Sequence, residues 1–143
     1  ITFRWTPVVP KPKDAVTYNY QTHLAGVMEK YVPGDYEFDV PKKLIDLYNK
    51  KDYGNYKDKT GDVPVGFTAT NHTTGGNSGS PALDAYGNLV GLNFDRQWEG
   101  TMSDINYDPR FSRNIMVDTK YILFIVDKFA DSKWLIDEMK IVK

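Results

Sequence analysis

The stretch Thr73-Thr-Gly-Gly-Asn-Ser-Gly-Ser-Pro81 lies between segments that have the composition of β-strands. Before it, Val63–Thr70 alternates apolar and small polar residues, as a strand with one buried face does. After it, Pro81–Asp84 and Asn88–Phe94 predict a hairpin that turns at Ala85-Tyr-Gly87. The sequence therefore predicts a strand, a tight glycine-rich loop and a hairpin, in that order.

The segments after the hairpin favour one more strand and then a helical C-terminal part. Asn114–Asp118 has the composition of a strand. Asp118 or Thr119 can then cap a helix that extends to about Phe129, and Ser132–Lys140 continues the helical periodicity. The side chains expected on the inner face of the first helix are Tyr121, Ile122, Ile125 and Val126.

Upstream of the first clear strand the signals are mixed. Residues 1–20 contain three prolines and favour a strand followed by a loop. Thr22–Tyr31 fits either a short helix or a strand edge, because Gly26 weakens its helical pattern. Pro41–Lys50 predicts a helix with proline in its first turn, and the polar residues 50–63 predict a surface connector. The apolar residues at helical spacing are Leu24, Val27 and Met28 in the first segment and Leu44, Ile45 and Tyr48 in the second.

The composition is that of one folded domain with little net charge. Of the 143 residues, 41% are hydrophobic and 26% are charged, which suffices for a single core. The aromatic share of 14% favours strands and recognition surfaces over a helical bundle. The formal net charge of -1 provides no broad basic face, so we expect no nucleic-acid partner.

The lack of cysteine excludes disulfides, catalytic thiolates and Cys-ligated zinc within these residues. The two histidines are distant in sequence and the carboxylates show no ligand spacing, so we expect neither a metal nor a cofactor. The longest apolar run, Tyr121–Val126, is too short to span a bilayer. Because the chain begins at Ile1 without an initiator Met, we expect a fragment or a processed product.

Ser78 is the candidate nucleophile in the glycine-rich loop. Glycines on both sides allow a tight turn in which backbone N–H groups converge on one point. In the chymotrypsin arrangement, the nucleophile's own N–H and that of the glycine two residues earlier bind the tetrahedral oxyanion, and here these are Ser78 and Gly76. Gly79 leaves the hydroxyl unobstructed, and Pro81 directs the chain into the next strand.

A Gly/Ser-rich hexapeptide can also be no more than a flexible loop. The flanking strands argue against that alternative, because flexible linkers lie in polar surroundings. From these residues alone, the catalytic and the flexible-loop interpretations both stay open.

A wider pattern covers essentially the whole chain. It consists of His72-Thr-Thr-Gly-Gly-Asn-Ser-Gly-Ser-Pro81, Gly91-Leu-Asn-Phe-Asp-Arg-Gln-Trp-Glu-Gly100, Arg113-Asn-Ile-Met-Val-Asp118 and Lys120-Tyr-Ile-Leu-Phe124, with looser matches at Thr22–Lys30 and Pro41–Tyr48. With these motifs the chain resembles the bacterial dipeptidyl peptidases of serine peptidase family 46, and most closely their Asp/Glu-specific members. Together the motifs are highly specific.

The resemblance implies a mainly β fold, a chymotrypsin-like (trypsin-like serine protease) double β-barrel with a helical domain inserted upstream. Residues 1–143 would form its C-terminal half: the second barrel, a short internal helix and a C-terminal helix. The upstream barrel and the helical domain would lie outside this sequence. The family also implies a peptide substrate with a free N-terminus, a homodimer, and the periplasm or cell surface of a Gram-negative bacterium.

The catalytic triad of such an enzyme would be incomplete in this chain. The resemblance implies that the catalytic His and Asp come from the N-terminal barrel, so only Ser78 is carried over. Neither His72 nor His23 occupies the position of the family's general base, and we expect a structural role for His72. Because a serine without a base is a poor nucleophile, the isolated chain is expected to be inactive.

Three residues near the end of the predicted hairpin are candidates for substrate binding. Arg96 follows the strand that walls the S1 pocket in chymotrypsin-like folds, and its planar fork could hold an acidic P1 side chain. An alternative is a surface ion pair of Arg96 with Asp95 or Glu99. The resemblance favours the selector role for Arg96 and implies that Asp95 accepts the substrate's α-ammonium group. Phe94 is expected to add an apolar wall.

Two other classes of function remain open at this stage. A trypsin-like endopeptidase would share the serine loop but would not need a free amine. A noncatalytic binding module with a trypsin-like fold would keep the scaffold without the chemistry. Trp98, Glu99 and Asp104 also match the family, and we expect packing or loop-anchoring roles for them.

Overall fold

The computed structural model describes residues 19–142, which divide into two compact units. Of the described residues, the first unit contains 19–22 and Gly66–Thr119, and the second contains His23–Val65 and the chain from Lys120 onward. The strand and loop expected for residues 1–20 lie almost entirely outside the described part of the chain. No described helix is both long and apolar enough to cross a membrane.

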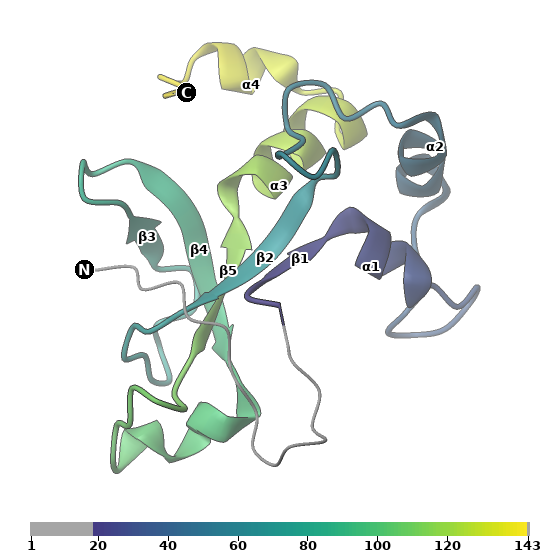
Figure 1. The fold of residues 1–143 in the computed structure, drawn as a ribbon. Coiled ribbons are helices and arrows are strands. Elements are labelled where there is room, and N and C mark those ends of the chain that lie inside the picture. The colour runs from purple at the N-terminus through teal and green to yellow at the C-terminus, as the bar shows by residue number, and fades with distance from the viewer. Residues whose placement is uncertain (1–18, 143) are drawn as a thin grey trace. The chain divides into compact units, whose positions relative to one another are not determined.

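A five-stranded sheet with the strand order β1-β2-β5-β4-β3 carries the candidate site. The pairs β2–β5, β4–β5 and β3–β4 are antiparallel, and Figure 1 shows β3 beside β4 at one edge. Over residues 19–142 the strand order is linear, so the sheet does not close into a barrel. The mainly β prediction is confirmed, and the barrel remains a prediction. The strands are β1 (Gln21–His23), β2 (Pro64–Ala69), β3 (Pro81–Leu83), β4 (Leu89–Arg96) and β5 (Asn114–Asp118).

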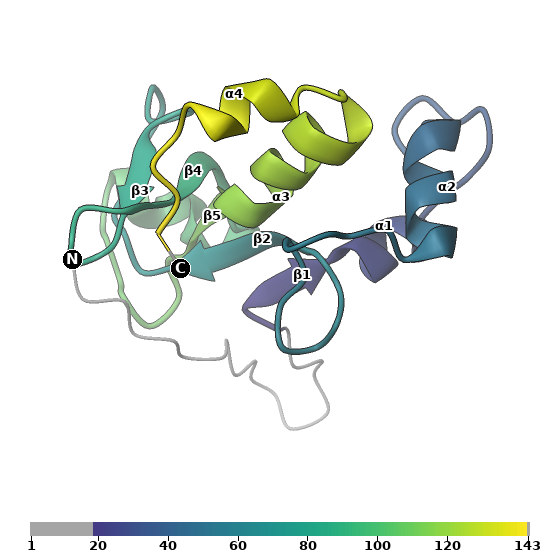
Figure 2. The same ribbon diagram turned by 90° about the horizontal axis from the view of Figure 1, so that it is seen from above.

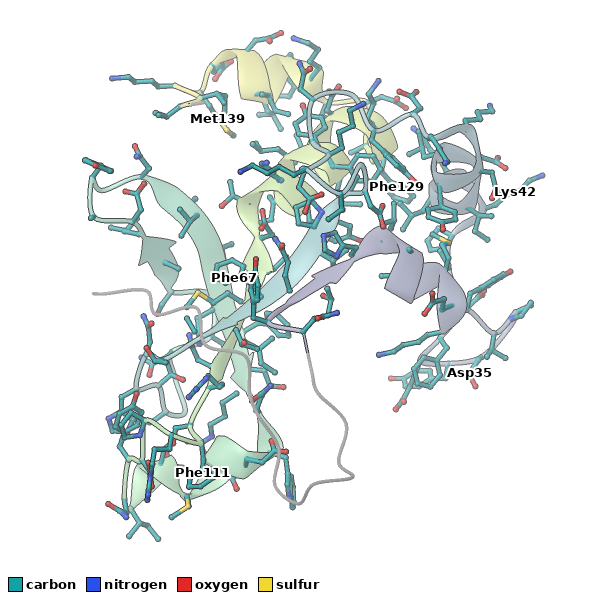
Figure 3. All side chains as sticks on the ribbon, viewed as in Figure 1. Asp35, Lys42, Phe67, Phe111, Phe129 and Met139 are labelled. Carbon is teal, nitrogen blue, oxygen red and sulfur yellow. The ribbon has the colours of Figure 1, made fainter. Side chains whose placement is uncertain are left out.

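The core of the first unit lies on this sheet. Phe67 of β2, which is labelled in Figure 3, packs with the buried side chains of Ala69, Ala82 and Met116. A Cβ atom at Gly91 of β4 would lie 2.9 Å from the Phe67 ring and 2.7 Å from a β5 carbonyl oxygen. Glycine is therefore required where the Phe67 ring crosses β4.

The regular structure of the second unit is mainly helical. The helix predicted over Pro41–Lys50 is confirmed as α2 (Lys42–Lys50), with Pro41 just before its first residue. Both structures considered for Thr22–Tyr31 are present, because β1 ends at His23 and α1 (Leu24–Glu29) begins directly after it. The polar connector predicted over residues 50–63 contains turns and no regular element from Lys51 onward, but Tyr53 and Val63 within it are buried, so it does not lie wholly at the surface.

The C-terminal helices follow the predicted pattern with one difference in the buried face. The predicted helix is α3 (Thr119–Phe124), which continues as a π-helix over Ile125–Phe129, and α4 (Lys133–Asp137) lies beside this segment in both ribbon views (Figures 1 and 2). Phe124 is the residue of this helix that is fully buried, although the predicted inner face omitted it. It is buried because the rings of Tyr53 and Tyr56 both pack edge-on against it.

Candidate active site

The glycine-rich loop connects β2 to β3 and is held by a series of short turns. The N–H of Asn77 donates to the carbonyl of Thr74 over 3.2 Å, and the N–H of Thr74 donates to the Asn77 side-chain oxygen over 2.8 Å. Gly76 has a φ of +94° and Gly79 a φ of +83°, in the region that favours glycine. A Cβ atom would meet nothing within 4 Å at either position, so the backbone conformation requires glycine here and packing does not.

Strand β4 holds the second half of this loop. The N–H of Gly79 donates to the Asn93 carbonyl over 2.7 Å, and the N–H of Asn93 donates to the Ser80 carbonyl over 2.9 Å. The buried side chain of Asn93 donates to the Asn77 carbonyl and accepts a bond from Asn114 on β5. Asn93 thus fixes the backbone on both sides of Ser78. Asn93 was not among the predicted site residues, although it lies two residues after buried Gly91, at the spacing of one sheet face.

Ser78 is exposed at the surface of the loop. Its hydroxyl donates to the carbonyl oxygen of Phe94 over 3.4 Å, a long and weak hydrogen bond that leaves Oγ accessible. Within residues 19–142, the backbone N–H groups of Gly76 and Ser78 donate to no acceptor. Exposed, unsatisfied N–H groups beside a hydroxyl can stabilise an oxyanion, which is the role predicted for both residues.

A pocket of about 120 Å³ adjoins this serine. It brings together four residues singled out from the sequence: Ser78, Phe94, Asp95 and Arg96. Gly76, the predicted second oxyanion donor, does not line it. The other lining residues are Thr73, Thr74, Gly75 and Asn93.

An irregularity in β4 determines how the pocket residues are displayed. Asn93 pairs with Met116 of β5 and Asp95 pairs with Ile115, so Phe94 is an extra residue in the ladder. As in other β-bulges, the extra residue changes the direction of the side chains near it. Phe94 and Asp95 are both exposed, and the Asp95 carboxylate accepts the backbone N–H of Arg96 over 2.8 Å.

Arg96 forms a two-bond ion pair with Asp104. Its Nη1 and Nη2 atoms each donate to one carboxylate oxygen of Asp104 over 2.6 Å. These bonds raise the pKa of Arg96 and lower the pKa of Asp104 relative to their ordinary values. The alternative of a surface ion pair named Asp95 or Glu99 as the partner, and both choices were wrong. The partner lies eight residues along the chain, where a helix returns it to β4.

That helix is a 3₁₀ segment over Trp98–Asp104, which the sequence analysis did not predict. Buried Ser103 ties it to the site, because its hydroxyl accepts a bond from Arg96 over 3.2 Å and its carbonyl bonds to His72 over 2.9 Å. The His72 ring also lies 4.8 Å from the ring of Tyr107. Trp98 and Glu99 are exposed.

Neither histidine contacts the candidate nucleophile. His72 is occupied by Ser103 and Tyr107, as its expected structural role requires, and His23 pairs with Asp58 over 2.8 Å. Within the described residues no group of three or more His, Asp or Glu side chains could hold a metal ion. The pocket therefore offers the hydroxyl and backbone N–H of Ser78, a carboxylate and a guanidinium, and the N–H of Gly76 lies on the same loop outside the pocket lining. These groups suit the binding and attack of a peptide carbonyl.

This chain is similar to one protein family and to several known proteins. The family model described as Peptidase S46 matches residues 10–141. The Asp/Glu-specific dipeptidyl-peptidase of Flavobacterium psychrophilum is 72% identical over 131 residues, which are 92% of this chain and 18% of that protein. Dipeptidyl-peptidase 7 of Phocaeicola vulgatus is 52% identical and also covers 92% of this chain, which spans 18% of that protein.

Crystal structures of DPP11 also match this chain. The crystal structure of Porphyromonas endodontalis DPP11 in complex with the dipeptide Arg-Asp matches with a TM-score of 0.87 and 52% identity, over 91% of this chain and 19% of that one. The complex of the same enzyme with Arg-Glu matches with a TM-score of 0.86 and 53% identity, over 90% of this chain and 18% of that one. This chain thus spans about a fifth of the length of the relatives it matches.

Proposed function

Because this chain belongs to the peptidase S46 family, we propose that it is part of a serine dipeptidyl peptidase that releases N-terminal dipeptides ending in Asp or Glu. The observation that carries the proposal is that Ser78 and Arg96 line the same pocket. A nucleophile and a fixed cation on one cavity suit a scissile carbonyl that follows an acidic side chain. The dipeptides in the two DPP11 complexes, Arg-Asp and Arg-Glu, support this preference.

In the proposed reaction, Ser78 Oγ attacks the carbonyl carbon of the second substrate residue and loses its proton to a general base. The N–H groups of Gly76 and Ser78 bind the developing oxyanion. Collapse of this intermediate breaks the peptide bond, and the departing amine takes up the proton from the base. Water then hydrolyses the acyl-serine ester and releases the dipeptide, which regenerates the hydroxyl.

We assign substrate recognition to three adjacent residues of β4. Arg96 would bind the P1 carboxylate, Asp95 would bind the α-ammonium of the free N-terminus, and Phe94 would form an apolar wall. The two charged side chains begin one residue apart, so they could receive opposite charges of one short substrate. A fixed distance from ammonium to scissile bond is what restricts cleavage to dipeptides.

The rest of the proposed enzyme lies outside these residues. We propose that residues 1–143 are the C-terminal part of a double-β-barrel peptidase domain, which contributes much of the second barrel and a C-terminal helix. The catalytic His and Asp would come from an N-terminal barrel, with a helical domain beside it. We further propose a homodimer in the periplasm or at the cell surface of a Gram-negative bacterium, from the resemblance to the family.

A comparison of three reporters with the full-length protein tests this function. The first reporter is a dipeptidyl amide with a free N-terminus and Asp directly before the scissile amide. The others are its N-acetylated form and a longer peptide with Asp at an internal position, and the expected result is hydrolysis of the first alone. Cleavage of the acetylated and longer peptides would identify an endopeptidase instead. A serine-directed fluorophosphonate should label the parent protein and fail to label Ser78→Ala. Absence of both labelling and turnover would indicate a noncatalytic module.

A further inference from the structure

We infer that Asp104 is a positioning residue for Arg96: it holds the guanidinium so that one particular edge faces the acidic P1 side chain. This inference rests on the proposed function of the pocket. It adds a residue outside the pocket lining to the machinery that selects the substrate.

The contact geometry leaves one edge of the guanidinium available. A guanidinium can grip a carboxylate along the edge between its two Nη atoms or along the edge between Nε and one Nη. Asp104 occupies the first edge, with 2.6 Å to each nitrogen. Within residues 19–142, Nε donates to no acceptor and Nη2 donates only to Asp104. The second edge is therefore the one that can receive the substrate carboxylate.

Further bonds hold the guanidinium between two segments of the site. Nη1 also lies 3.2 Å from the Ser103 hydroxyl and 3.4 Å from the carbonyl oxygen of Thr73. The first contact ties Arg96 to the 3₁₀ helix, and the second ties it to the segment that leads to Ser78. A flexible arginine becomes a fixed one, so less side-chain freedom is lost when the substrate binds.

Asp104 also keeps Arg96 from the other carboxylate nearby. Asp95 is adjacent in sequence, and its carboxylate bonds to the backbone N–H of Arg96 without touching the guanidinium. If Asp104 were neutral, Arg96 could turn to Asp95, and the proposed sites for P1 and for the ammonium would neutralise each other. The ion pair with Asp104 keeps Arg96 available for the P1 carboxylate and Asp95 available for the ammonium group.

The charge of Asp104 opposes a substrate carboxylate, but solvent weakens that repulsion. The Asp104 side chain is 48% exposed, whereas that of Arg96 is only 22% exposed. Water therefore screens Asp104 more effectively than the cation it holds. We expect the gain from a fixed orientation to exceed the loss from repulsion.

Steady-state kinetics of the full-length protein test this role. In Asp104→Asn, which keeps the shape and removes the charge, KM for a reporter ending in Asp should rise about tenfold. Its kcat, and kcat/KM for a reporter ending in Leu, should change less than about threefold, because neither depends on holding Arg96. Asp104→Glu retains the charge with one extra methylene, and its KM should lie between those of the parent and Asp104→Asn.

A control and a double variant separate positioning from general damage. Asp137→Asn removes a carboxylate from the exposed ion pair with Lys133 in α4 and should leave all constants unchanged. In an Arg96→Ala background, Asp104→Asn should have no further effect on the preference for Asp over Leu, because Asp104 acts through Arg96.

The possible outcomes distinguish failure of the inference from failure of the proposed function. If Asp104→Asn lowers KM or leaves the Asp preference intact while Arg96→Ala abolishes it, the positioning role is wrong. An additional loss in the double variant would also overturn it. If Arg96→Ala itself leaves the preference intact, the proposed function of the pocket fails.

Discussion

The side-chain amide of Asn93 donates a hydrogen bond to the backbone carbonyl of Asn77, the residue directly before Ser78, over 3.2 Å. Asn93 is 7% exposed, and its side-chain oxygen accepts a second bond from Asn114 over 2.9 Å. A buried polar pair thus fixes the conformation of the exposed glycine-rich loop.

Asn93→Ala should loosen this loop and destabilise the protein. The change leaves the Asn77 carbonyl and the Asn114 amide without their partner, which costs about 1–3 kcal/mol for buried groups. We also expect kcat to fall about tenfold, because the proposed oxyanion donors lie on the same loop. Thermal unfolding and kcat should be measured beside Asn49→Ala, an exposed change on α2 that should alter neither. An unchanged kcat in Asn93→Ala would show that the Asn93–Asn114 pair does not influence catalysis.

Gly76→Ala should reduce activity more than stability. A Cβ meets no neighbour there, so the cost comes from the φ of +94°, and relief of that strain would turn the N–H from the oxyanion. Loss of one donor lowers kcat about 10²-fold. Gly87→Ala is a matched control in the β3–β4 turn, with a φ of +83° and equally open surroundings. Equal loss of kcat in both variants would contradict the assignment of Gly76.

Arg96→Gly should lower kcat/KM after Asp and Glu by about 10²-fold and spare uncharged P1 residues. Arg96→Lys keeps the charge but not the planar fork, so it should recover only part of the preference. A panel of dipeptide reporters that differ only at P1 measures this directly. Retention of the full acidic preference in Arg96→Gly would refute the assignment.

Gly91→Ala should destabilise the sheet by about 1–3 kcal/mol, because the new methyl would overlap a β5 carbonyl and the Phe67 ring. Gly26→Ala in α1 adds a methyl group where nothing lies within 4 Å, and should be neutral or stabilising by up to about 1 kcal/mol. The unfolding midpoint of Gly91→Ala should fall, and that of Gly26→Ala should rise or stay unchanged. A Gly91 variant as stable as the parent would disprove the close packing.

Asp58 should make stability depend on pH in the acidic range. Burial alone would raise its pKa, but bonds from Thr60 and His23 outweigh burial and lower the pKa of Asp58 from 3.8 to about 2. The folded state therefore gains stability from this carboxylate above about pH 4 and loses it as the pH falls toward 2. Asp58→Asn should be less stable than the parent by about 1 kcal/mol at pH 6.

The difference between Asp58→Asn and the parent should narrow between pH 4 and pH 2, because the carboxylate of the unfolded parent takes up a proton in this range before that of the folded parent does. A pH series of unfolding midpoints measures it. Asp46→Asn, an exposed change on α2, controls for the loss of a carboxylate. A difference that stays constant down to pH 2 would show that the pKa of Asp58 is not lowered.

The sequence predicted the elements whose signals are local. Alternation gave β2 and the β3–β4 hairpin, and helical spacing gave α2. The partner of Arg96 could not be found in this way, because Asp104 reaches it only through a 3₁₀ helix whose residues have no amphipathic pattern. Buried Phe124 was missed for a related reason: the two tyrosine rings that cover it come from the irregular connector before β2.

The extra residue at Phe94 limits how this site can change during evolution. Deleting this extra residue would remove the bulge and leave Asp95 opposite Ile115 and Arg96 opposite Asn114 in a regular ladder, so the local change of side-chain direction that the bulge produces would be lost. Replacement of Arg96 would change only one of the two proposed binding positions, whereas a one-residue deletion would redirect the side chains of both at once. New specificities in this lineage should therefore arise by substitution at a constant length of β4.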